Sequence, residues 1–133
     1  MKNLTAKNCR KLADIYASVP ATTHVKMMDG CNCAAGFLGR IKGLPEKEQL
    51  LYDEGKKYLY DTLLPGKGSV FEKEDRVRLA LLKLGYKTDH FTLTSTHMGA
   101  YRKKFVEGQD GYTTTGWLAR FWRRVASQLE AGK

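Results

Sequence analysis

Gly116-Trp-Leu-Ala-Arg-Phe-Trp-Arg-Arg-Val-Ala-Ser-Gln-Leu-Glu-Ala131 is the stretch that decides the fold. Its apolar side chains recur every three or four residues, which places them on one face of an α-helix. Arginines occupy the other side, and three threonines precede Gly116. This is the most strongly amphipathic segment of the chain, so we expect a long helix whose aromatic face enters the core. The apolar face consists of Trp117, Leu118, Phe121, Trp122, Val125 and Leu129.

Upstream of this helix, glycine and proline divide the chain into further helical segments. Thr5 can cap a first helix whose end is limited by Pro20. A second helix is expected from Cys33 onward. Its apolar residues share one face, whereas the small residues Ala35, Gly36 and Gly39 lie on the other. Since small residues let backbones approach, we expect another element to pack closely there.

Two more helices follow, and each has a recognisable start. Pro45 suits the first position of a helix that continues to Pro65. The sequence Ser69-Val-Phe-Glu72 is a capping box, and the helix that it opens should stop at Gly85. Because Leu79 and Leu82 widen the apolar surface of this helix beyond one stripe, we expect it near the centre of the fold.

The remaining segments favour short extended structure and one more helix. The range 22–28 is either a short strand or an extended connector, and the range 86–93 alternates weakly. A threonine or serine at 94–96 could cap a helix that carries Met98, Tyr101 and Phe105. The sequence therefore predicts a mainly α fold of about five or six helices with at most a small β element, in a single domain over residues 1–133.

Composition limits the class of protein and its location. The 133 residues are 42% hydrophobic, which excludes a disordered chain. Three cysteines argue against a secreted disulfide scaffold. No apolar run approaches the roughly 20 residues of a membrane span, and the N-terminus lacks a signal-peptide core. We therefore expect a cytoplasmic protein, in the host cytoplasm if it is viral.

The strong positive charge indicates an anionic partner. The formal net charge is +9, with a pI of about 9.5. Between Tyr101 and Arg124 there are six basic and two acidic residues, and the basic ones lie beside aromatic residues. Such a surface can neutralise phosphates, although the aromatic spacing is that of a core-facing stripe. The predicted binding residues are Arg102, Lys103, Lys104, Arg120, Arg123 and Arg124.

The turn Cys31-Asn-Cys33 permits three interpretations. Zinc could be held by Cys31, Cys33, Cys9 and one histidine, but structural zinc sites usually place two to four residues between paired cysteines. The second interpretation is a reactive thiol, since a helix N-terminus lowers the pKa of a cysteine. The third is structural: Cys33 is in phase with Phe37 and would be a small core residue.

The N-terminal third resembles a group of small phage-type proteins. The resemblance rests on Asn8-Cys-Arg-Lys-Leu-Ala-Asp14, on Met27-Met28 and on Cys31-Asn-Cys-Ala-Ala-Gly36, and it covers about the first forty residues. It implies a viral or mobile-element origin. It also favours binding of a host component over catalysis.

Together these features predict a phage-type accessory protein that binds an anionic partner, either nucleic acid or an acidic host protein, through its basic C-terminal surface. We expect no cofactor, no metal and no catalytic residue in that role. The alternative is a small thiol- or metal-dependent enzyme built on the turn of Cys31 and Cys33.

Overall fold

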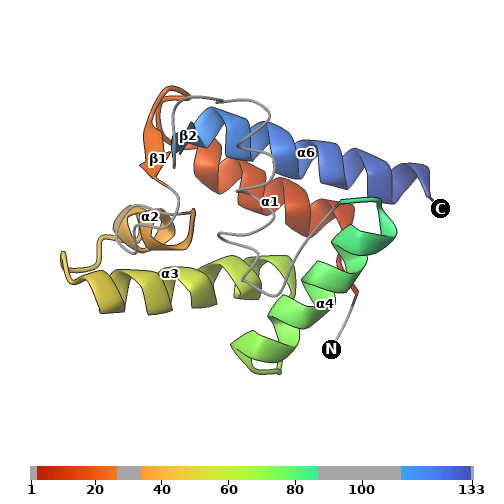
Figure 1. The fold of residues 1–133 in the computed structure, drawn as a ribbon, viewed down its shortest axis with the longest axis horizontal. Coiled ribbons are helices and arrows are strands. Elements are labelled where there is room, and N and C mark those ends of the chain that lie inside the picture. Colours follow the sequence, from red (N-terminus) through yellow and green to blue (C-terminus); the bar gives the residue numbers. More distant parts are fainter. Residues whose placement is uncertain (1–2, 27–33, 87–111, 133) are drawn as a thin grey trace.

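The computed structural model describes residues 3–26, 34–86 and 112–132. These residues form a mainly α fold, as predicted, with five helices and one small two-stranded sheet (Figure 1). The predicted extended stretch after Tyr86 and the predicted helix of Met98, Tyr101 and Phe105 lie outside the described residues. The elements are α1 Ala6–Ala17, β1 His24–Lys26, α2 Ala34–Ile41, α3 Glu48–Leu63, α4 Val70–Lys83, β2 Tyr112–Thr114 and α6 Thr115–Ala131.

Three of the helices begin at side-chain caps, and the sequence predicted those at Thr5 and Ser69. The hydroxyl of Thr5 accepts a hydrogen bond from the Asn8 backbone N–H at 3.2 Å, and that of Ser69 accepts one from Glu72 at 3.1 Å. Thr114 caps α6 in the same way. Each bond satisfies a backbone donor that the first turn of a helix leaves unpaired.

The start of α3 differs from the prediction. Pro45 is not its first residue, because the helix begins three residues later, at Glu48. Instead, the backbone N–H of Lys47 donates to the Pro45 carbonyl at 2.8 Å, which closes a tight turn before the helix. Pro45 therefore shapes the connection from α2 to α3.

The two strands join distant parts of the chain. They pair antiparallel, with His24 opposite Thr114 and Lys26 opposite Tyr112. The contact continues into α6, where the Thr115 N–H donates to the Thr23 carbonyl at 2.9 Å. This pairing fixes the start of α6 beside the end of α1, and the two helices then run side by side (Figure 1).

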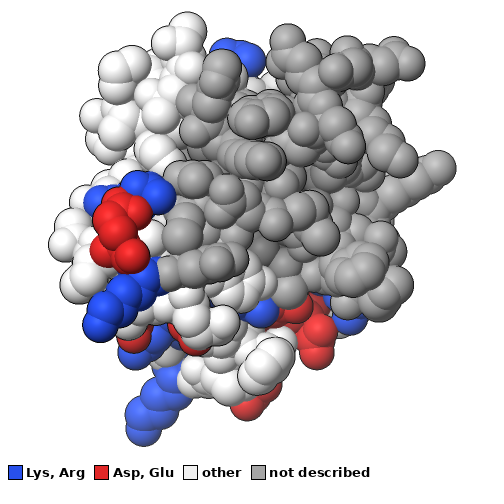
Figure 2. Space-filling model, turned by 60° about the vertical axis from the view of Figure 1, so that its left-hand side comes forward, with Lys and Arg blue, Asp and Glu red and all other residues white. Residues whose placement is uncertain are grey.

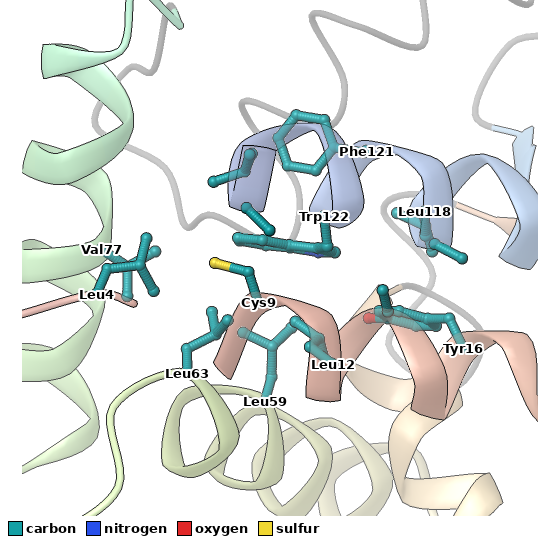
Figure 3. Close-up of a cluster of buried hydrophobic side chains, with 14 of the residues drawn as sticks. Leu4, Cys9, Leu12, Tyr16, Leu59, Leu63, Val77, Leu118, Phe121 and Trp122 are labelled. Carbon is teal, nitrogen blue, oxygen red and sulfur yellow. The ribbon is translucent and has the colours of Figure 1, made fainter. Parts of the chain in front are cut away.

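Trp122 lies at the centre of the hydrophobic core and is fully buried. Figure 3 shows its indole over Cys9 of α1, with Leu59 and Leu63 of α3 beyond that cysteine. Phe121 packs edge-on to Trp122, with ring centroids 5.1 Å apart. The prediction that the aromatic face of the last helix enters the core is confirmed, because Trp117 is also buried.

Helices α2 and α3 approach each other closely through small residues. A Cβ atom at Gly55 would lie 1.7 Å from the Ala35 carbonyl oxygen, and one at Gly39 would lie 2.7 Å from the Leu51 carbonyl oxygen. Both distances are far below van der Waals contact, so only glycine fits at these positions. The predicted close approach at the small face of α2 is confirmed.

The expectation that α4 lies near the centre of the fold is wrong. Val77 and Leu81 point inward, but Leu79 is 54% exposed and Leu82 is 43% exposed. Helix α4 lies at the edge of the molecule and buries only one face (Figure 1). On that face Lys73 is almost fully buried, and its ammonium group donates to Asp61 of α3 at 2.7 Å.

Candidate anionic-partner surface

The three predicted arginines of the last helix share the solvent-facing side of α6. Arg120, Arg123 and Arg124 are all exposed. The aromatic residues between them point into the core, so they offer no stacking platform for bases. Contact with a nucleic acid through these arginines would therefore not include base stacking, while their guanidinium groups are suited to its phosphates.

Helix α1 adds basic residues that the sequence analysis did not single out. The helix runs antiparallel to α6, because Arg10 pairs with Glu130 and Asp14 pairs with Arg123 at 3.4 Å. Lys7 and Lys11 are also exposed and lie one turn apart on α1, with Asp14 on the same side of the helix. We define the α1–α6 basic surface as Lys7, Arg10, Lys11, Arg120, Arg123 and Arg124.

The acidic residues of this surface order its cations without cancelling their charge. Asp14 and Glu130 are the only acidic residues in the two helices, against six basic ones. The side-chain hydrogen bond from Arg10 to Glu130 raises the pKa of Arg10 and keeps it charged. Arg123 remains half-exposed beside Asp14. Ion pairs at such exposure add little stability, and the guanidinium groups remain accessible to another anion.

The remaining predicted basic residues stay predictions. Arg102, Lys103 and Lys104 lie outside the described residues, so their position relative to the α1–α6 basic surface is untested. Lys7 and Lys11 could have been found from their four-residue spacing on the polar side of the first helix. The contact of their helix with Arg123 through Asp14 could not, because it depends on packing between segments more than a hundred residues apart.

A surface of mixed charge is found at the end of the molecule that carries α2 and β1. Figure 2 brings this end forward, and its described residues show Lys and Arg next to Asp and Glu. Arg40 of α2 forms an ion pair with Glu46, which precedes α3. The described part of this face therefore has mixed charge, in contrast to α1 and α6.

The cysteine turn lies outside the described residues, as do His90 and His97. The structure does describe Cys9, which was a candidate zinc ligand. It is fully buried among apolar side chains under Trp122 (Figure 3). Burial raises the pKa of its thiol from 9.0 to about 12. Cys9 is thus a packing residue, and no group of three potential metal ligands occurs among the described residues.

The buried thiol should make stability fall at high pH. The unfolded chain releases the proton of Cys9 near pH 9.0, whereas the folded chain holds it to about pH 12. Unfolding in this window therefore releases a proton, and each pH unit can cost up to about 1.4 kcal/mol. Urea unfolding of wild type and Cys9→Ala at increasing alkaline pH checks this. We expect a steeper loss in wild type, and equal slopes would contradict it.

Comparison with models of known protein families, with curated proteins and with solved structures gives no match to this chain. None of the described helices is long and apolar enough to cross a membrane.

Proposed function

We propose that this protein is a non-enzymatic binding protein that contacts the phosphate backbone of nucleic acid through the α1–α6 basic surface. The observation that carries the proposal is the concentration of six exposed cations and only two acids on two packed helices. Basic side chains in such number release counterions from a polyanion, which drives association.

The arrangement of the surface favours backbone contact. Four of its six cations are arginines, whose planar guanidinium groups match phosphate oxygens in pairs. The helices that present them are held by the core around Trp122, so little ordering is required on binding. Because phosphate contacts carry no sequence information, affinity should be largely independent of base sequence.

The resemblance to phage-type proteins supports an accessory role in a host cytoplasm. It also supports an acidic host protein as the other anionic partner. That possibility is an outcome of the test below. The enzymatic alternative on Cys31 and Cys33 stays a prediction, because both cysteines lie outside the described residues.

Salt titration tests the proposal directly. Fluorescence anisotropy should detect binding of labelled, random-sequence DNA of about 20 nucleotides at low salt. If the six cations contact phosphates, the logarithm of the binding constant should fall against the logarithm of salt with a slope of about −5 on duplex DNA. Binding of polyglutamate in the absence of any nucleic-acid binding would reject nucleic acid in favour of an acidic protein.

A further inference from the structure

A groove lies between α4, the segment before α1 and the last turns of α6. It has a volume of about 470 Å³. Its apolar lining comes from all three segments and includes Leu4, Leu79, Ala80, Leu84 and Leu129. Leu84 and Leu129 also pack on the core, so the inner part of the groove is a fixed part of the fold.

Apolar surface continues from the groove onto the outside of α4. Leu79 contributes to the groove and is 54% exposed, and Leu82 beside it is 43% exposed. Large exposed apolar side chains next to a concave apolar lining are typical of a surface that binds another chain. A small molecule seated in the groove would leave Leu82 uncovered, so the shape favours a larger partner.

Two cations of the groove indicate which charge a complementary partner would carry. Arg76 and Lys83 line the same groove and are both exposed. They are seven residues apart on α4, which is about 10 Å or two helical turns. No acidic side chain lines the groove within the part of the chain that the structure describes. A complementary partner therefore carries apolar residues over two turns, with acidic residues beside them.

From this geometry we infer that the groove binds an acidic amphipathic helix of a partner protein. Its apolar side chains, at spacings of three and four residues, fit against Leu79, Leu84 and Leu129. Its carboxylates meet Arg76 and Lys83. Helix-in-groove binding matches a site formed by helices and a short chain segment.

The groove lies on the other side of α6 from Arg120, which belongs to the α1–α6 basic surface. Leu129 and Arg120 are both on α6, but nine residues correspond to about two and a half turns, so they point to opposite sides. Leu129 lines the groove, whereas Arg120 is exposed on the other side. The inference therefore goes beyond the proposed function, and either can fail alone.

A panel of stapled, fluorescein-labelled peptides of about 15 residues tests the inference. In each peptide, glutamates flank three apolar positions. The residues at these apolar positions vary among leucine, isoleucine, methionine and phenylalanine. We expect members of the panel to bind with a Kd in the micromolar range, and Leu79→Glu or Lys83→Glu to weaken them about tenfold or more. Peptides with lysine in place of glutamate should not bind.

The matched control is Arg124→Glu, which lies on the α1–α6 basic surface. It should leave peptide affinity unchanged, while Leu79→Glu should leave nucleic-acid affinity unchanged. Circular dichroism and thermal melts establish that each variant is folded. The inference is overturned if no peptide binds, or if Leu79→Glu binds as well as wild type. It is also overturned if decanoate alone binds the groove, or if Leu79→Glu instead abolishes self-association in sedimentation.

Discussion

Gly55→Ala is expected to destabilise the protein by about 3 kcal/mol or more, which is a large part of the stability of a small domain. The added Cβ would lie 1.7 Å from the Ala35 carbonyl oxygen and 3.0 Å from the Gly39 backbone nitrogen. Both neighbours are backbone atoms of α2, so no side-chain rotation can relieve the overlap. The two helices must separate, which loosens the packing of Leu38 and Leu51.

The sign of this effect opposes helix propensity. Alanine favours a helix interior over glycine by about 1 kcal/mol, so an open site would gain stability from the same change. Urea unfolding followed by circular dichroism measures the difference. A thermal midpoint lowered by about 10 °C is expected for a chain of this length.

Gly132→Ala is the matched control for Gly55→Ala. It follows the end of α6 at a φ of −81°, which alanine adopts easily. The atom nearest to its added Cβ is 3.6 Å away, an ordinary contact. The free energy of unfolding of the Gly132→Ala variant should stay within about 0.5 kcal/mol of the wild-type value. If Gly55→Ala behaved like this control, the close packing of α2 on α3 would be refuted.

Reversal of Arg120, Arg123 and Arg124 to glutamate should reduce nucleic-acid affinity by about a hundredfold or more near physiological salt. Three reversals of two units each lower the net charge from +9 to +3. More importantly, they place three carboxylates where phosphates would bind. Since all three side chains are exposed, the fold should persist. Anisotropy titrations measure the affinity, and the salt slope should become shallower as phosphate contacts disappear.

A control with the same net charge separates local contact from overall charge. Lys47, Lys57 and Lys67 are exposed on α3 and on the segments beside it, so they belong to neither α1 nor α6. Their reversal to glutamate gives the same net charge of +3. Beyond a Debye length of about 10 Å, salt screens their effect, so affinity should change only a few-fold. Equal losses in both triple variants would mean that the α1–α6 basic surface is not the binding site.

Much of the fold could be predicted because its signals are local. The caps at Thr5 and Ser69 act over three residues, so they can be recognised without knowledge of the tertiary structure. The periodicity of the last helix predicted both its buried aromatic face and its exposed arginines. The position of α4 could not be predicted in this way. Periodicity reveals apolar residues but not whether enough neighbours exist to cover Leu79 and Leu82.

The candidate site was only half predictable for a related reason. Arg120, Arg123 and Arg124 share one face of one helix, and helical geometry alone places them together. The addition of Lys7, Arg10 and Lys11 depends on the antiparallel packing of α1 on α6. That packing depends in turn on strand pairing between residues 24–26 and 112–114. The docking groove likewise exists only where three distant segments meet.

The sequence by itself determined where most of the helices begin, which side of the last helix is apolar and which sign of charge the protein presents. These properties follow from interactions within one or two turns and from composition. Only the tertiary structure decided that Gly55 faces a carbonyl oxygen, that the two basic helices α1 and α6 pack side by side and that part of α4 stays exposed. These depend on contacts between residues far apart in the chain, whose geometry is fixed when the core closes around Trp122.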